Sequence, residues 1–203
     1  MFPYLSPAAH VPVTGIGLII LFGFMAAFFA SMLRARAAAK QDAEGPVKTA
    51  QASKLGIGVQ MLGFAWVGVG PLQIRWNGVD RALIIEALVI FLLAGATVYL
   101  FTAARTALAK NWSFVARTRA DHQLVQSGPY RFVRHPIYLC LLLWMIAMAL
   151  AMGHPQRLVI AIPVYILGTV WRVSEEEKLL RAMFGAEFDG YAARVKRFIP
   201  GLL

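Results

Sequence analysis

The sequence predicts a single all-α integral membrane protein with five transmembrane helices. Its composition, its apolar runs and the placement of its basic residues all support this class. Of the 203 residues, 59% are hydrophobic and 15% are charged, whereas soluble domains have roughly 45–50% and about 25%. A soluble globule of this length has too small an interior for so many apolar side chains. The composition therefore excludes a soluble enzyme, and it also excludes a disordered chain.

Five apolar runs define the expected spans. The first contains 23 residues without a charge, which form a helix of about 35 Å, long enough to cross the hydrocarbon core. No basic segment precedes it, so we expect a retained span rather than a signal peptide. Glycines in the second run, such as Gly56 and Gly58, are expected to let helices approach closely. The five runs are Val11–Leu33, Leu55–Ile74, Ala82–Ala104, Pro136–Met152 and Leu158–Trp171.

The last two runs are joined by only a short connection, Gly153–Arg157. So short a connection forces the two helices into an antiparallel hairpin. The fifth helix is expected to continue beyond Trp171, because Arg172–Phe184 contains no helix breaker. The polar segments that flank the hairpin, Arg105–His135 and Arg172–Leu203, should then lie side by side beneath it.

The basic residues indicate the orientation of the spans. Five spans divide the 20 Lys and Arg residues into a group of 17 and a group of three, which are Arg75, Arg81 and Arg157. Because basic residues prefer the cytoplasmic side, the larger group is expected there, with the N-terminus outside and the C-terminus inside. The net charge of +10 fits contact with an anionic membrane surface better than contact with nucleic acid.

A polar cluster is expected at the cytoplasmic mouth of the fourth span. Pro136 can begin a helix, and a Gly-Pro turn precedes it, so the side chains between them gather near the membrane edge. One interpretation is an interfacial belt of Tyr and Arg at the lipid headgroups. An interfacial belt accounts for the tyrosines and arginines, but it accounts less well for His135, which lies between Tyr130 and Tyr138. The cluster contains Tyr130, Arg131, Arg134, His135 and Tyr138.

A second polar group follows the fifth span. Arg172 and Glu176 are four residues apart and share one helix face. Glu175, Glu176 and Glu177 point in directions about 100° apart, so we expect one or two of them to face inward and the rest to be solvated. The pair of Arg172 and Glu176 is either an exposed salt bridge of little energetic value or one half of a ligand site. The other half of such a site would be the cluster around His135.

Together the two polar groups suit a small zwitterionic ligand with an aromatic part. Arg172 can pair with a carboxylate, and Glu176 can accept hydrogen bonds from an ammonium group or from sugar hydroxyls. S-adenosylmethionine has this chemistry, and so do other nucleotides. An apolar wall for a purine could come from Leu124, Val125 and Ile137.

The remaining polar residues favour structural roles. Glu86 lies about one turn into the third span, where it can reach the headgroups or pair with Arg81 or Arg75. His154 has no partner in the sequence. Cys140, the only cysteine, is expected to be buried as a small apolar side chain. A single cysteine excludes a disulfide framework and a cysteine-based zinc site, and no metal is expected.

The C-terminal half contains several short motifs. They are Ser127-Gly-Pro-Tyr-Arg-Phe-Val-Arg-His-Pro-Ile-Tyr138, Glu176-Glu177 with Leu180, Phe184-Gly185, Phe188, Tyr191, Val195 and Phe198-Ile-Pro200. In this order and at these distances they resemble the isoprenylcysteine carboxyl methyltransferase family, which belongs to a wider group that includes membrane phospholipid methyltransferases. The resemblance covers about His122 to Pro200, and the first two spans contribute no motif.

The resemblance implies a multispan membrane enzyme that transfers a methyl group from S-adenosylmethionine and leaves S-adenosylhomocysteine. The cofactor would lie on the cytosolic side beneath the last hairpin, and a lipophilic substrate would enter from the bilayer. Residues 1–203 would form one membrane domain, with a three-helix part at 1–104 and a catalytic part at 105–203. Transferred by motif, the cofactor contacts are His122, Gln123, Leu124, Val125, Tyr130, His135, Pro136, Ile137, Tyr138 and Glu176.

The resemblance also implies that Arg172 binds the substrate, and it makes Arg172 and His135 the predicted catalytic residues. An acceptor carboxylate needs no general base, whereas an amine acceptor needs one, for which His135 is a candidate. The chain departs from some family members at Val115, where those members have a cofactor-binding glutamine. It also departs at Phe188, where tyrosine is usual.

Three functions remain open from the sequence. The favoured one forms a methyl ester on a prenyl-cysteine-like carboxylate, and the second methylates a phospholipid amine or a small thiol. The third is a non-catalytic membrane scaffold. Transport is disfavoured, because the charged residues lie at one face rather than at the membrane midplane. Lipids are the expected partners, and the sequence predicts no oligomeric state.

Overall fold

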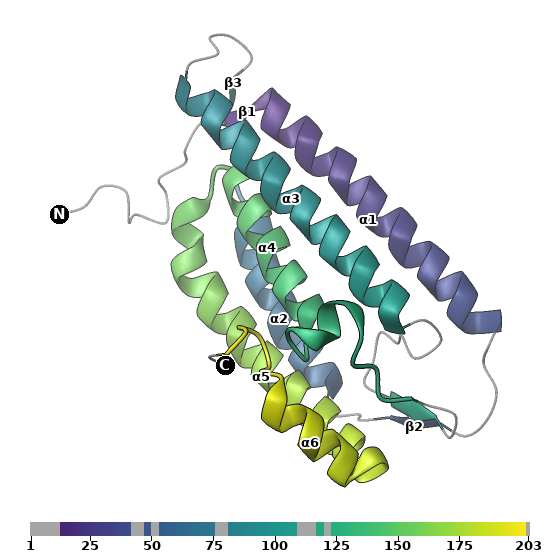
Figure 1. Cartoon of the computed structure of the whole chain (residues 1–203). Coiled ribbons are helices and arrows are strands. Elements are labelled where there is room, and N and C mark those ends of the chain that lie inside the picture. The colour runs from purple at the N-terminus through teal and green to yellow at the C-terminus, as the bar shows by residue number, and fades with distance from the viewer. Residues whose placement is uncertain are drawn as a thin grey trace.

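The protein is an elongated helical bundle (Figure 1). The computed structural model describes residues 13–41, 47–49, 53–75, 81–108, 117–119 and 123–201. A helix forms at each of the five predicted places, which confirms the all-α class. These helices are α1 (Gly15–Gln41), α2 (Ser53–Gly68), α3 (Arg81–Leu108), α4 (Pro136–Ala151) and α5 (Leu158–Phe184).

Short elements complete the two ends of the bundle. Near the start of α1, strand β1 (Val13–Thr14) pairs in parallel with β3 (Ile74–Arg75). At the opposite end, β2 (Val47–Thr49) pairs in antiparallel fashion with β4 (Arg117–Arg119). These strands were not predicted from the sequence, because two or three residues are too few to show an alternating pattern. The other short elements are the 3₁₀ turns η3 (Gly128–Arg131) and η4 (Pro155–Arg157) and the helix α6 (Ala186–Arg194).

The helices differ in their capacity to cross a bilayer. Three segments among the described residues are long and apolar enough to do so, namely Gly15–Arg34, Arg81–Leu108 and Pro155–Phe184. The helices α2 and α4 have 16 residues each, so each rises about 24 Å, less than the hydrocarbon thickness of about 30 Å. Because three segments are long and apolar enough to span, the protein is integral to the membrane. Because α2 and α4 are shorter, the count of five spans stays a prediction.

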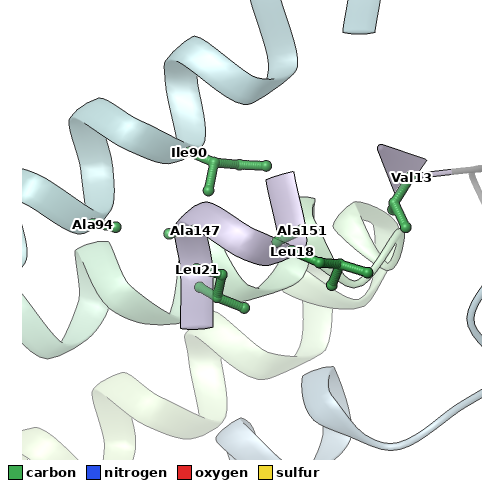
Figure 2. Packing of buried hydrophobic residues seen from close by; sticks show 7 residues of the cluster. All are labelled: Val13, Leu18, Leu21, Ile90, Ala94, Ala147 and Ala151. Carbon is green, nitrogen blue, oxygen red and sulfur yellow. The ribbon is translucent and has the colours of Figure 1, made fainter. Parts of the chain in front are cut away.

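One part of the core lies where α1, α3 and α4 meet. Figure 2 shows small alanine side chains of α3 and α4 facing each other beside larger aliphatic side chains of α1 and α3. The small residues let the helix backbones approach, and the aliphatic side chains fill the remaining space. The buried members of this cluster are Val13, Leu18, Leu21, Ile90, Ala94, Ala147 and Ala151.

The other part of the bundle is built on the packing of α2 against α5. A Cβ atom on Gly56 would lie 2.8 Å from the carbonyl oxygen of Gly168, and a Cβ on Gly168 would lie 2.7 Å from the carbonyl oxygen of Gly56. The two backbones therefore approach as closely as only glycine permits. This confirms the expected role of Gly56, whereas a Cβ on Gly58 would meet no atom within 4 Å.

The predicted connection between the last two spans is present, but each helix has another principal neighbour. The turn η4 joins α4 to α5, which runs back along the bundle (Figure 1). The hydroxyl of Tyr165 in α5 donates a hydrogen bond of 2.7 Å to the carbonyl oxygen of Tyr138 in α4. Beyond these contacts, α5 packs mainly along α2 and α4 packs mainly along α3. The role of the hairpin as a cover for a cofactor stays a prediction.

The C-terminal end of α2 is capped by side chains from the η4 connection. The fully buried His154 places Nδ1 2.8 Å from the Val67 carbonyl oxygen and Nε2 3.2 Å from the Pro71 carbonyl oxygen. Arg157 donates from Nη1 to the carbonyl oxygens of Trp66, at 2.9 Å, and Val69. Carbonyl groups at a helix end need such donors, so His154 gains partners that its sequence context did not reveal.

Glu86 has a structural partner at the start of α1. It accepts a hydrogen bond from the main-chain N–H of Thr14. The hydroxyl of Thr14 in turn accepts a 2.8 Å hydrogen bond from the main-chain N–H of Gly17. A carboxylate near a helix N-terminus is also favoured by the helix dipole, so Glu86 helps to fix the first turn of α1 against α3.

Candidate functional site

Three segments far apart in sequence meet at the end of the bundle opposite η4. They are the stretch from η3 to the start of α4, the polar half of α5, and the chain that follows α6. Figure 1 shows α6 lying beside the end of α5, with the C-terminal trace turning back toward the bundle. Pro136 occupies the first turn of α4, as predicted, where its missing N–H costs no hydrogen bond.

His135 lies between two consecutive carboxylates of α5. Its Nε2 is 3.1 Å from Glu177 Oε1, and its Nδ1 is 3.7 Å from Glu176 Oε2. The imidazole is 7% exposed. Glu175 instead pairs with the exposed Lys178. This confirms the expectation that one or two of the three glutamates face inward.

Glu177 joins three cationic or imidazole side chains. Arg134 donates to its Oε1 from Nε at 3.0 Å and from Nη2 at 2.9 Å, and Arg197 donates from Nη2 to Oε2 at 2.7 Å. The carboxylate side chain is 4% exposed. The sequence-based set of site residues contained Glu176 but not Glu177. The only sequence signals for Glu177 were the run of glutamates and the Glu-Glu motif.

The C-terminal segment fixes the backbone on which His135 sits. The main-chain N–H of Arg134 donates to the Lys196 carbonyl oxygen at 2.8 Å, and that of His135 donates to the Arg197 carbonyl oxygen at 3.0 Å. Val133 and Lys196 form a parallel bridge. Residues separated by about sixty positions are thus joined like neighbouring strands, which restricts the orientation of the imidazole.

Two buried tyrosines and the Arg197 guanidinium complete this support. The hydroxyl of Tyr191 in α6 donates to the Tyr130 carbonyl oxygen at 2.7 Å. Burial raises the pKa of Tyr191 to about 12. Burial, and to a smaller extent the negative charge of Glu176, raises the pKa of Tyr130 well above its usual value. The hydrogen bond to Glu177 raises the pKa of Arg197. At neutral pH both phenols therefore stay protonated and Arg197 stays charged.

A second group centres on Glu176, the more exposed of the two inward carboxylates. The hydroxyl of Tyr138 donates to Glu176 Oε1 at 2.5 Å, and Arg172 Nη2 lies 3.5 Å from the same oxygen. The Arg172 guanidinium also lies 5.2 Å from the centroid of the Tyr138 ring, within the range of a cation–π contact. The predicted pair between Arg172 and Glu176 is therefore formed, but its members also contact other groups.

Arg172 has a further contact that sequence analysis missed. Its Nη1 donates to Gln60 Oε1 at 3.4 Å, and Gln60 belongs to α2. In the sequence, Gln60 lies within an apolar run with no motif around it, so nothing there related it to Arg172.

The structure brings together some of the sequence-predicted residues and separates others. His135, Tyr138, Arg172 and Glu176 converge, and Tyr130 is buried. Ile137 instead packs against the cluster of Phe101 and the buried Cys140. Gln123, Leu124 and Val125 lie in the irregular segment before η3, and His122 and Val115 lie outside the described residues. Among the described residues, no group of His, Cys, Asp and Glu has the arrangement of a metal site.

A comparison with family models relates this region to known proteins. The model described as phospholipid methyltransferase matches residues 84–187, just over half of the chain. The chain belongs to this family. The match confirms the resemblance inferred from the motifs, and it covers η3, α4, α5 and most of α3.

Individual relatives of this chain are named protein-S-isoprenylcysteine O-methyltransferase, which is more specific than the family description. It is 36% identical over 104 residues to the protein-S-isoprenylcysteine O-methyltransferase of Saccharomyces cerevisiae, covering 50% of this chain and 44% of that protein. It is 33% identical over 80 residues to a probable enzyme of the same name from Oryza sativa subsp. indica, covering 39% and 42%. A relative from Dictyostelium discoideum is 29% identical over 92 residues, covering 41% and 35%. The chain thus spans less than half the length of these relatives.

Proposed function

We propose that the protein is an S-adenosylmethionine-dependent membrane methyltransferase whose acceptor is a lipophilic carboxylate of the prenyl-cysteine type. The observation that supports this most strongly is the convergence of His135, Tyr138, Arg172 and Glu176 from two segments within the family-matched region. A salt bridge at a helix surface would not require a buried imidazole and a phenol at the same carboxylate. The names of the relatives support the choice of acceptor.

The donor set fits the amino-acid part of S-adenosylmethionine. Glu176 is 23% exposed at its side chain, so it remains accessible to an ammonium group, and Tyr138 orients it by donating to Oε1. A charge-assisted hydrogen bond to that ammonium group is stronger than a neutral one. His135 and Tyr138 offer ring surfaces beside the same carboxylate. When bound, the cofactor supplies an electrophilic methyl group, which leaves its sulfur as the new bond to the acceptor forms.

Arg172 is proposed to hold the acceptor carboxylate. The guanidinium is mostly buried yet lies next to Glu176, so an acceptor bound to Arg172 would lie beside a cofactor bound to Glu176. Placing donor and acceptor in line lowers the barrier by several kcal/mol, about 7–11 at most. The attacking carboxylate oxygen is already unprotonated at neutral pH, so no residue has to remove a proton.

A phospholipid amine is the second candidate acceptor. The family description favours it, and the chain offers His135 as the base that an amine acceptor would need. In that case Arg172 would hold the carboxylate of the cofactor instead. A panel of methyl acceptors distinguishes the two chemistries.

The proposed site faces the cytoplasm. The distribution of Lys and Arg supports this orientation, because the residues around the site (Arg131, Arg134, Arg181, Arg194 and Arg197 among them) belong to the larger basic group. A lipophilic acceptor would then reach Arg172 from the inner leaflet, while a water-soluble cofactor would enter from the cytosol.

The proposal is tested by methyl transfer from labelled S-adenosylmethionine to N-acetyl-farnesyl-cysteine, phosphatidylethanolamine and a simple thiol. We expect transfer to the prenyl-cysteine, and loss of cofactor affinity in Glu176→Ala by about 1–3 kcal/mol, as for a hydrogen bond to a charged group. Glu175→Ala is the matched control, because Glu175 pairs with the exposed Lys178. A protein that binds no cofactor would be a scaffold, and transfer to phosphatidylethanolamine alone would overturn the carboxylate acceptor.

A further inference from the structure

Gln60 is a polar side chain deep within an apolar helix. It lies in α2, outside the residues matched by the family model, and it is 2% exposed. An uncompensated amide in such surroundings costs free energy, and a polar residue inside a membrane protein is a candidate for a functional role. Gln60 therefore needs hydrogen-bond partners inside the bundle.

Both ends of the Gln60 amide have partners on α5. Its Nε2 donates to Thr169 Oγ1 at 2.7 Å, and its Oε1 accepts from Arg172 Nη1 at 3.4 Å. The reverse orientation of the amide would place an NH₂ group against a guanidinium, which has only donors. Arg172 therefore selects the orientation in which the amide oxygen faces it, and Thr169 stabilises that orientation by accepting the hydrogen bond from Nε2.

The helix packing brings the amide within reach of Arg172. Gly56 lies one turn before Gln60, and a Cβ there would lie 2.5 Å from Arg172 Cγ. The absence of a side chain at Gly56 leaves room for the aliphatic part of Arg172 to cross α2. Gly168, one turn before Arg172, gives α5 the same freedom, since a Cβ there would lie 2.9 Å from Gln60 Cγ.

The two terminal nitrogens of Arg172 consequently have different partners. Gln60 Oε1 is 3.4 Å from Nη1, and Glu176 Oε1 is 3.5 Å from Nη2. A carboxylate attracts a guanidinium more strongly than an amide does. Without the amide, the guanidinium would be drawn toward Glu176 and would compete with the proposed ammonium group of the cofactor.

We propose that Gln60 is a positioning residue that holds Nη1 of Arg172, so that the guanidinium moves no closer to Glu176 than its 3.5 Å contact and stays available to the acceptor carboxylate. This rests on the proposed function, which assigns the acceptor to Arg172. It also gives α2 a part in the reaction, although the helix has no family motif.

The experiment compares Gln60→Leu with the wild type, using N-acetyl-farnesyl-cysteine as the acceptor. We expect the acceptor KM to rise about tenfold, as for the loss of one hydrogen bond to a charged group, with a smaller change in cofactor affinity. Thr169→Val should shift KM in the same direction, and Thr169→Ser, which keeps the hydroxyl, should restore most of the acceptor affinity that Thr169→Val loses. An unchanged KM in a folded Gln60→Leu protein would overturn the proposal.

Val67→Ala is the matched packing control. Val67 is also a buried residue of α2, but it packs against Met145, Ala149 and Tyr165 rather than against Arg172. We expect Val67→Ala to lower the thermal midpoint without raising the acceptor KM. If Gln60→Leu behaves in the same way, its role is packing alone and the positioning role is wrong.

A second readout does not depend on activity. Phenylglyoxal modifies accessible arginine side chains, and mass spectrometry can follow its reaction with Arg172. Gln60→Leu should change the rate at Arg172 but not at the distant Arg157, and an unchanged rate at Arg172 would contradict the positioning role. If the wild type methylates no carboxylate acceptor, the proposed function fails, while this measurement still decides whether Gln60 positions Arg172.

Discussion

The dipeptide His-Pro occurs twice in the chain, as His135-Pro136 and His154-Pro155, at opposite ends of α4. In each copy the proline enters the first turn of a helical segment. In each copy the imidazole is at least nine-tenths buried, and an arginine that binds main-chain carbonyl oxygens lies within three residues, Arg134 in one case and Arg157 in the other. The local sequences are therefore alike, but the partners of the two imidazoles differ.

His135 faces side chains, whereas His154 faces backbone. The ring of His135 lies against the carboxylates of Glu176 and Glu177, and side-chain partners can exchange for a ligand without any change in a helix. The ring of His154 lies against the carbonyl oxygens of Val67 and Pro71, which cannot be replaced unless the end of α2 is uncovered. The neighbouring elements, rather than the dipeptide, thus separate a candidate site from a helix cap.

The largest expected effect concerns the placement of the two copies on opposite faces of the membrane. In a Cys140→Ala background, Leu72→Cys near the His154 end should react with a membrane-impermeant maleimide in intact cells. Lys178→Cys near the His135 end should react only after permeabilisation, because the basic residues near it favour the cytoplasm. Both positions are exposed. Labelling of both from the same side would contradict the proposed topology.

Glu177→Gln should cause the largest loss of stability. It removes the charge that Arg134, His135 and Arg197 share, and breaking a buried ion pair on one side costs about 3–5 kcal/mol. Thermal unfolding in detergent measures this loss. Glu175→Gln is the matched control, since the pair of Glu175 with the exposed Lys178 should contribute less than about 1 kcal/mol. Similar midpoints for the two variants would show that Glu177 does not organise the site.

Substitution of the two histidines should separate stability from binding. His154→Ala leaves carbonyl groups at the end of α2 without this donor and should cost about 1–3 kcal/mol of unfolding free energy. S-adenosylhomocysteine should still raise the thermal midpoint of this variant as much as that of the wild type. His135→Ala should largely abolish that rise, although Arg134 and Arg197 continue to bind Glu177. The reverse pattern would assign the ligand site to the other end of α4.

The sequence predicted the features that depend on local pattern. Apolar runs located all five helices, and the His135 and Glu176 motifs located a cluster that the structure does assemble. The spacing of Arg172 and Glu176 correctly placed them on one face of α5. The helices and the shared face depend on residues separated by at most a few helical turns. The cluster joins segments about forty residues apart, and its prediction depended on the short connection between the last two spans and on the motifs.

The features that the sequence did not predict depend on which helices become neighbours. The short connection predicted an antiparallel hairpin of α4 and α5, but it did not indicate that α5 packs mainly along α2, where Gly56 and Gly168 approach closely. The contact of Gln60 with Arg172 follows from this packing. The binding of Glu177 by Arg197 similarly depends on the return of the chain after α6, which no local pattern encodes.

That return has a consequence for the order in which the protein is made. The N–H groups of Arg134 and His135 obtain their acceptors only from Lys196 and Arg197, which leave the ribosome some sixty residues later. A nascent chain that ends shortly before Lys196 would already contain all five long helices. Its imidazole would lack the main-chain support found in the finished protein. Ligand binding would therefore begin only after Lys196 and Arg197 have been added, and a chain interrupted before them would enter the membrane without sequestering the cofactor.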